Sequence, residues 1–157
     1  MSKSFALAGL RLGWIATHDR DLLGRMNRLK DYTTICGSAP SEILALMALR
    51  AREHVVGRSR GIIARNLPLL DDFFGRHESR LSWVRPRGGS VGFPRLCTNA
   101  PGAVDAFCAR LVETEGVLLL PGSQFEHPGN HFRVGFGRAD MPQALEILDD
   151  FVSRLTA

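Results

Sequence analysis

The first residues of the chain carry an amine and a guanidinium at a spacing that could do chemistry together. Lys3 is followed by Gly9 six residues on, by Arg11 eight residues on and by Gly13 ten residues on. An uncharged lysine amine attacks carbonyl carbons, and a guanidinium holds phosphate or carboxylate oxygens with paired hydrogen bonds. Lys3 and Lys30 are the only lysines, whereas 18 residues are arginine. These residue types would suit covalent chemistry on a carbonyl beside an anion site.

If both groups act on one small molecule, this spacing requires the chain to turn back on itself. Eight residues in extended conformation would span about 27 Å, which is much more than the distance between two groups of one small molecule. Gly9 lies between Lys3 and Arg11 and suits such a turn, because glycine tolerates backbone conformations that other residues avoid. The alternative is that Lys3 is an ordinary solvated lysine, which composition alone would favour.

The same stretch, Ser-Lys-Ser-Phe-Ala-Leu-Ala-Gly-Leu-Arg-Leu-Gly-Trp over residues 2–14, resembles the lysine signature of a known enzyme family. These are the class I/II pyridoxal-phosphate-dependent aminotransferases of fold type I. The resemblance implies that Lys3 is catalytic and forms a Schiff base with pyridoxal 5'-phosphate, whose ring is the electron sink of the reaction. It also implies that Arg11 binds the cofactor phosphate.

A second segment resembles the family far downstream. Residues 131–137 read His-Phe-Arg-Val-Gly-Phe-Gly and are similar to the segment that carries the arginine for the substrate α-carboxylate. The resemblance implies that this arginine is Arg133, and a bidentate pair with a carboxylate explains why arginine is preferred to lysine. The alternative for Arg133 is a surface arginine on a strand. Arg138 is the nearby competitor and is interpreted as a loop or surface charge.

The chain is expected to be α/β, with an α+β small domain that resembles the C-terminal portion of a fold-type-I enzyme. Residues 1–78 are interpreted as a remnant of the large domain and inter-domain helices, including the cofactor-lysine loop, and residues 79–157 as the small domain. Arg-Pro-x-Gly-Gly over residues 85–89 and the run over residues 116–123 add to the resemblance. In intact members the lysine follows a large domain whose cofactor contacts cannot be mapped here, so this chain alone is not expected to transaminate.

Hydrophobic periodicity and capping residues predict the elements. Asp19 and Ser38 are the expected N-caps of two helices, Gly116 is expected to end a third, and Pro68 is a possible kink. The order after residue 79 is β-β-α-β-β-α, with both helices on one face of the sheet. The expected elements are a buried strand over residues 12–17, helices over 19–30, 38–52 and 54–77, strands over 81–86 and 90–96 as a hairpin-like pair, a helix over 104–115, strands over 117–120 and 131–136, and a helix over 141–155.

Composition excludes several classes of protein. Hydrophobic residues make up 45% and charged residues 23%, which is typical of a globular chain rather than a disordered one. The net charge of +4 is small, and the densest arginine cluster, over residues 50–65, is interpreted as a solvated helix face rather than a nucleic-acid site. The three cysteines have no metal-site spacing, so no metal is expected, and with no secretory or membrane segment they favour the cytoplasm.

The function expected from the resemblance is transfer of an amino group between an amino acid and a keto acid, in a homodimer in the intact family. Two alternatives stay open. One is another pyridoxal-phosphate chemistry, such as decarboxylation, elimination or cyclisation. The other is a non-catalytic relic or interaction module, because the apolar helix faces of the first half would be exposed without a large domain.

Overall fold

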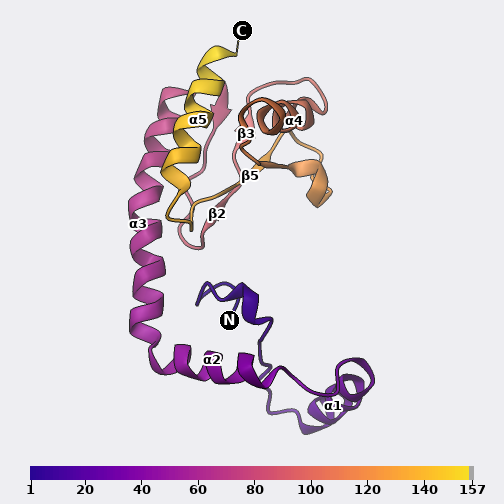
Figure 1. Ribbon diagram of the computed structural model, residues 1–157. Coiled ribbons are helices and arrows are strands. Elements are labelled where there is room, and N and C mark those ends of the chain that lie inside the picture. The colour runs from indigo at the N-terminus through magenta and orange to yellow at the C-terminus, as the bar shows by residue number, and fades with distance from the viewer. Residues whose placement is uncertain (156–157) are drawn as a thin grey trace. The chain divides into compact units, whose positions relative to one another are not determined.

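The computed structural model describes residues 1–155 and divides into two compact units, Met1–Ser59 and Arg60–Ala157. The division falls inside the long helix, because the second half of that helix contributes Leu70, Phe73 and Phe74 to the core of the second unit. The boundary predicted after residue 78, between a large-domain remnant and a small domain, stays a prediction. Figure 1 shows the elements. Those of the first unit are η1 (Ala8–Leu10), α1 (Arg20–Thr33), α2 (Ala39–Arg50) and the start of α3 (Arg52–Arg76).

The predicted helix starts of the first unit are confirmed. The Asp19 carboxylate accepts a hydrogen bond from Leu22 N at 2.9 Å, and the Ser38 hydroxyl accepts one from Ser41 N at 3.4 Å. Each side chain thus satisfies an amide that the helix leaves without an intrahelical partner. Helix α1 runs to Thr33, beyond the predicted end at Lys30, and α3 continues through Pro68 without a break.

The predicted buried strand over residues 12–17 is wrong. This segment has no regular structure, and its large side chains are exposed, Trp14 at 63% and Ile15 at 65%. A strand forms only when a neighbouring strand takes up its backbone hydrogen bonds, and within residues 1–59 the structure describes no strand that could do so. The apolar face predicted for α2 is also mostly exposed, and only Ala45 and Ala48 are buried in that helix.

The second unit contains two small antiparallel sheets. Strand β1 pairs with β3, while β5 lies between β2 and β4. The register places Leu81 opposite Leu96, Val91 opposite Gly135 and Leu120 opposite Arg133. The elements are β1 (Leu81–Ser82), β2 (Val91–Gly92), β3 (Arg95–Leu96), α4 (Ala103–Glu115), β4 (Leu120–Pro121), η2 (Gly122–Phe125), β5 (Phe132–Gly135) and α5 (Met141–Arg154).

Three of the strands predicted in the second unit differ from the observed ones. The strand predicted over residues 81–86 extends only over Leu81–Ser82. The strand predicted over residues 90–96 is divided at Phe93–Pro94: its end pairs with β1 as predicted, but its start pairs with β5. The apolar run 117–120 forms a strand only at its last residue, and Leu118 is exposed. The strand predicted over 131–136 and the helices predicted over 104–115 and 141–155 are confirmed to within a few residues at their ends. Gly116 ends α4 with a left-handed backbone, as its φ of 71° shows.

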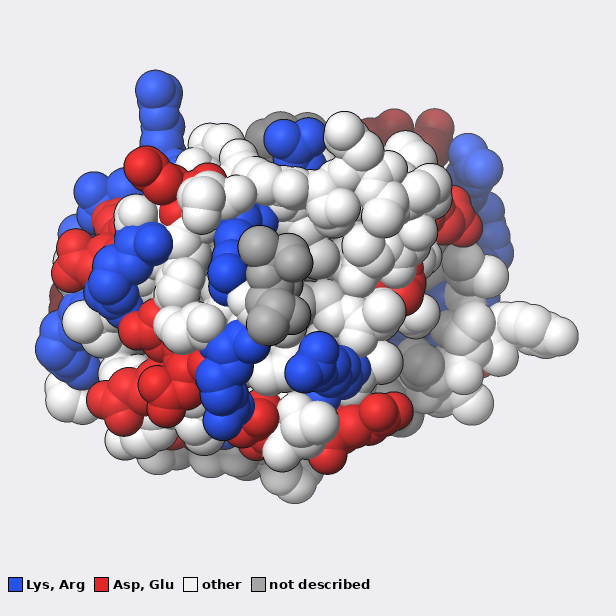
Figure 2. Space-filling view, turned by 90° about the horizontal axis from the view of Figure 1, so that it is seen from above, with Lys and Arg blue, Asp and Glu red and all other residues white. Residues whose placement is uncertain are grey.

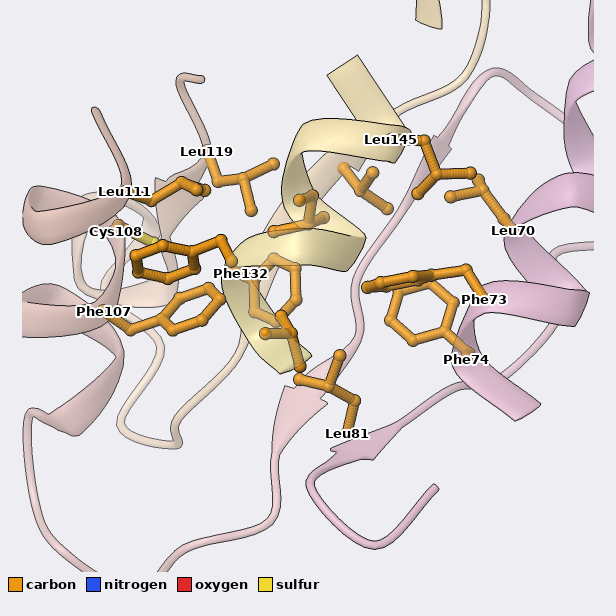
Figure 3. Packing of buried hydrophobic residues seen from close by; sticks show 14 of the residues in the cluster. Leu70, Phe73, Phe74, Leu81, Phe107, Cys108, Leu111, Leu119, Phe132 and Leu145 are labelled. Carbon is orange, nitrogen blue, oxygen red and sulfur yellow. The ribbon is translucent and has the colours of Figure 1, made fainter. Parts of the chain in front are cut away.

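The core of the second unit lies between helices and the inner face of β5. Figure 3 shows Phe73 and Phe74 from α3 pointing toward Phe132, with Phe107 from α4 on the other side. Helices α4 and α5 share this core, because the ring of Phe107 lies 5.6 Å from the rings of both Phe132 and Phe151. Helix α3 runs beside α5 (Figure 1), and the two are joined where Arg76 and His77 both bind the carboxylate of Asp149.

The indole of Trp83 closes one side of this core. It stacks on Phe74 with ring centroids 4.6 Å apart and donates a hydrogen bond to the Asp71 carboxylate at 2.8 Å. The space that it occupies exists because residue 92 is glycine. A Cβ on Gly92 would lie 2.5 Å from the nearest Trp83 ring atom.

The one buried polar residue of α3 ties this helix to the segment after β5. Asn66 is 3% exposed and donates hydrogen bonds to the carbonyls of Phe136 at 3.0 Å and Arg138 at 2.7 Å. We expect Asn66→Ala to lower the free energy of unfolding by about 1–3 kcal/mol, because the buried carbonyl of Phe136 and the partly buried carbonyl of Arg138 lose their donor. Asn27→Ala, on the exposed surface of α1, is the matched control and should change it by less than about 0.7 kcal/mol. Urea unfolding of both variants measures this, and equal effects would contradict the role of Asn66.

The three cysteines differ in their surroundings. Cys36 and Cys97 are exposed, whereas Cys108 is buried, and burial followed by the charge of Asp105 raises the pKa of its thiol to about 11. Since the thiolate is the reactive form, we expect an aromatic disulfide reagent at pH 8 to modify two thiols rapidly and Cys108 only after denaturation. Absorbance of the released thiol measures this. A single rate for all three thiols would show that Cys108 is accessible.

Candidate active site

Lys3 and Arg11 line one open depression of about 460 Å³ in the first unit, together with Ser2, Ser4 and Leu12 among others. The chain therefore folds back between them, as their spacing predicts. The fold-back is held by backbone hydrogen bonds, from Ala6 N to Lys3 O at 3.0 Å and from Arg11 N to Ala8 O at 3.3 Å. The sequence motif thus brings an amine and a guanidinium to one place.

The turn itself is made differently from the prediction. Gly9 lies within η1, whereas the left-handed backbone conformations fall on Ala6, with a φ of 54°, and on Arg11, with a φ of 50°. The left-handed backbone conformation is less stable for a residue with a Cβ atom than for glycine. Arg11 offsets part of this cost, because its Nη1 donates a hydrogen bond to Ala8 O at 3.2 Å. This bond also holds the guanidinium beside the turn.

The chemistry of these residues fits a small phosphorylated aldehyde. Lys3 supplies an exposed amine, Arg11 supplies a guanidinium, and Ser2 and Ser4 supply hydroxyls, all from residues that line the depression. None of the residues described as lining it is a carboxylate. A positive, donor-rich wall of this kind favours an anion such as a phosphate group.

Arg133 lies in the second unit, on β5. Burial alternates along this strand, with Phe132 and Val134 buried and Arg133 exposed between them. Successive side chains of a strand point to opposite faces, so packing of the two apolar neighbours in the core presents the guanidinium on the outer face. The described residues offer its guanidinium no ion pair or hydrogen bond. The arginine is thus available for a ligand carboxylate.

Arg138 is a surface charge, as the sequence predicts. Its guanidinium makes two hydrogen bonds to the exposed carboxylate of Asp140, at 2.9 and 2.8 Å, which raises the pKa of Arg138 and lowers the pKa of Asp140. The carbonyl of Arg138, by contrast, is held by Asn66. Asn66 was not predicted as a positioning residue, although a polar residue four positions after Ile62 and four before Leu70 on a helix is an available signal.

The loop before β5, which the sequence predicts to be a surface loop, is tied down at Asn130. Its amide donates to the carbonyls of Thr98 at 3.1 Å and Ala100 at 2.9 Å, and its oxygen accepts from Val104 N at 3.4 Å. The start of β5 is therefore joined to the N-terminal end of α4. This restraint fixes the backbone three residues before Arg133.

Two histidines of this loop pack on each other beside Arg133. The rings of His127 and His131 lie 4.4 Å apart, and Phe93 stacks on His131 at 5.1 Å. The Nδ1 atom of His131 is buried and has no hydrogen-bond partner among the described residues. Burial, followed by the charges of His127 and Arg95, lowers the pKa of His131. The ring is therefore neutral near pH 7.

Other kinds of site find less support in the described part of the chain. On the face drawn in Figure 2, acidic and basic side chains are interspersed among the described residues rather than gathered in one basic patch. Within residues 1–155, no three His, Cys, Asp or Glu side chains are grouped as metal ligands. No helix in that range combines the length and the apolar character needed to span a bilayer.

The family model for aminotransferase class I and II matches residues 1–149. This chain belongs to that family. A PLP-dependent aminotransferase from Streptococcus suis has a similar structure, with a TM-score of 0.87 and 31% identity over 99% of this chain and 41% of that one. The structural likeness places the fold among the fold-type-I enzymes, as the sequence predicts.

Two relatives with a named activity share slightly less of the sequence. Capreomycidine synthase from Streptomyces vinaceus is 28% identical over 96% of this chain and 38% of its own length. Aspartate aminotransferase from Geobacillus stearothermophilus is 27% identical over 99% of this chain and 38% of its own length. The chain thus spans about two fifths of the length of the relatives that it matches. These relatives include both a synthase and a transaminase.

The half-buried His131 ring should make stability depend on pH. Because its pKa is lowered on folding, the unfolded chain binds the proton more tightly, and stability falls as pH drops below about 6.5. We expect His131→Phe to lose less stability than the parent between pH 7.5 and pH 5. Urea unfolding at both values measures this, with His18→Gln, at an exposed position, as the control. An unchanged pH dependence in His131→Phe would contradict the assignment.

Proposed function

We propose that this chain supplies the lysine, a phosphate ligand and the substrate-carboxylate ligand of a pyridoxal-phosphate-dependent aminotransferase. The observation that carries the proposal is that Lys3 and Arg11, matched by the family signature, line the same depression. The reaction is transfer of an amino group from an amino acid to a keto acid. We propose further that residues corresponding to the large domain of the relatives are needed for turnover, since this chain spans about two fifths of their length.

Each of the three residues has a distinct task in this proposal. Pyridoxal phosphate, when bound, supplies an aldehyde and an electron-withdrawing ring. Lys3 Nζ would hold the aldehyde carbon covalently, with loss of water. After the substrate amine has displaced it, the freed Lys3 amine would take and return a proton at the substrate α-carbon as general acid and base. Arg11 and the hydroxyls of Ser2 and Ser4 bind the phosphate and fix its position relative to Lys3.

Arg133 orients the substrate. Its guanidinium can hold both oxygens of an α-carboxylate, and the two neighbours that anchor its strand in the core, Phe132 and Val134, limit its movement. A rigid strand suits this task better than a loop, because small displacements of a bound substrate cost large factors in rate.

A second candidate function is that of a module that binds another polypeptide. It is favoured by apolar side chains exposed in the first unit, among them Tyr32 at 90% and Ile35 at 71%. Such surfaces commonly mark interfaces. The two candidates are compatible, because an enzyme part that lacks its other domain also exposes the surface that the domain covers. Decarboxylation, elimination and cyclisation remain alternatives for the complete enzyme.

We also propose a homodimer and a cytoplasmic location for the complete protein. The dimer rests on the family resemblance. The location is supported by the three free cysteines, which suit a reducing compartment, and the reaction would then belong to amino-acid metabolism.

The proposal is tested by covalent trapping, which requires binding but no turnover. The 157-residue chain is incubated with pyridoxal phosphate, reduced with borohydride and mapped by peptide mass spectrometry. We expect the label on Lys3, and its loss in Lys3→Ala. Lys30→Ala is the matched control and should keep the label, because Lys30 lies on α1 and not in the depression.

The phosphate contact has its own readout in this assay. Arg11→Gln should reduce the labelling advantage of pyridoxal phosphate over pyridoxal, because only the former carries the group that Arg11 binds. Equal labelling of Lys3, Lys30 and the terminal amine would mean nonspecific reaction and would contradict the proposal.

A further inference from the structure

The register around β5 determines which side chains surround Arg133. Val91 lies opposite Gly135, Gly92 opposite Val134, and a further bridge places Arg95 opposite His131. The same register therefore puts Phe93 directly opposite Arg133. Burial agrees with it, since Gly92 and Pro94 are buried while the residues on either side of each are exposed.

The hydrogen bonds identify the type of this pair. Phe132 N donates to Pro94 O at 2.9 Å and Phe136 N donates to Ser90 O at 2.8 Å, so the hydrogen-bonded positions on β5 are the even-numbered ones. Phe93 and Arg133 consequently form a non-hydrogen-bonded pair. In such pairs the Cα atoms are about 4.5 Å apart and the side chains lie close together on one face.

The ring of Phe93 belongs to an exposed aromatic cluster. It stacks on His131 at 5.1 Å and an interplanar angle of 17°, meets His127 edge-on at 5.2 Å and meets Phe125 edge-on at 6.3 Å. Phe93 is 40% exposed and Phe125 is 47% exposed. Two large rings thus keep open surface beside an arginine that has no partner among the described residues.

On the other side of Arg133 the wall is aliphatic and open. Leu120 on β4 is its cross-strand neighbour, and Gly135 follows it on the same face, where no heavy atom lies within 4 Å of the position that a Cβ would take. A ligand carboxylate on Arg133 can therefore extend its remaining atoms over Phe93 without meeting a side chain at residue 135.

We infer that Phe93 is a specificity-determining residue that selects carboxylates with a flat apolar or aromatic side chain. This inference rests on the proposed role of Arg133 and deepens it. The carboxylate pairs with the guanidinium, while the flat group packs on the exposed part of the Phe93 ring and the edge of Phe125. The packed imidazoles support the ring of Phe93 from behind and keep it in place.

A second arginine near Arg133 supports a competing interpretation of the ligand, in which it carries two carboxylates. Arg95 lies on the same face, opposite His131, and could instead attract a second carboxylate. An aromatic surface lies between the two arginines, however, and a flat group on it requires no second charge. Dicarboxylates therefore provide the comparison that decides between the two interpretations.

The test measures binding of matched carboxylates to the 157-residue chain by ligand-observed NMR. The probes are 3-phenylpropanoate, hexanoate and glutarate. We expect 3-phenylpropanoate to bind most tightly, and Phe93→Leu to weaken it roughly threefold to tenfold relative to hexanoate, because a stacked aromatic pair is lost. Tyr32→Ala removes an exposed ring from the first unit and should leave the ratio unchanged.

Two further variants separate the possible failures. Arg133→Gln should weaken all three probes together, and if it does not, the proposed role of Arg133 is wrong. If Arg133→Gln weakens all three but Phe93→Leu leaves the ratio of 3-phenylpropanoate to hexanoate unchanged, the inference about Phe93 alone is overturned. Tighter binding of glutarate that is lost in Arg95→Gln would also overturn it. Amide spectra of Phe93→Leu verify that the variant is folded.

Discussion

Burial of the inner side chains of β5 and of the phenylalanine that follows it is the constraint on which the second unit depends. Phe132, Val134 and Phe136 insert into a core built from three helices. Because side chains alternate along an extended chain, the residues between them, Arg133 and Gly135, lie on the outer face. A slip of one residue would bury Arg133 and expose the phenylalanines. The apolar residues therefore specify the direction of the guanidinium, and Asn66 and Asn130 restrain the backbone on either side of it.

Features with local causes could be predicted from the sequence. Helices begin at Asp19 and Ser38 and one ends at Gly116, because capping and left-handed backbone depend on a few adjacent residues. Strands could not be predicted as well, since their partners are distant in sequence. The first residues of the strand predicted over 90–96 do not join the expected hairpin. They pair instead with β5, which lies some forty residues later in the sequence. Residues 12–17 have the composition of a strand but no described partner in their unit.

In the candidate site, too, features with local causes could be predicted and features that depend on distant contacts could not. The proximity of Lys3 to Arg11 follows from a motif, and the exposure of Arg133 follows from alternation. The backbone conformation of the turn could not be predicted. Left-handed conformations are uncommon for alanine and arginine, and Gly9 was the residue expected to adopt one. The ring cluster at His131 depends on contacts between residues far apart in sequence, which no local pattern reveals. Asn66 has a local signal in its spacing from Ile62 and Leu70, but its two carbonyl partners are some seventy residues away and could not be predicted.

The packing of Trp83 against Gly92 has a consequence for how this family member can change over time. Any side chain at position 92 would collide with the indole, so a substitution there survives only when residue 83 shrinks as well. Loss of the indole would in turn remove its stacking on Phe74 and its bond to Asp71. Among descendants of this sequence, positions 83 and 92 should therefore covary. A larger residue at position 92 should accompany a smaller one at position 83, so that the sum of the two side-chain volumes is conserved.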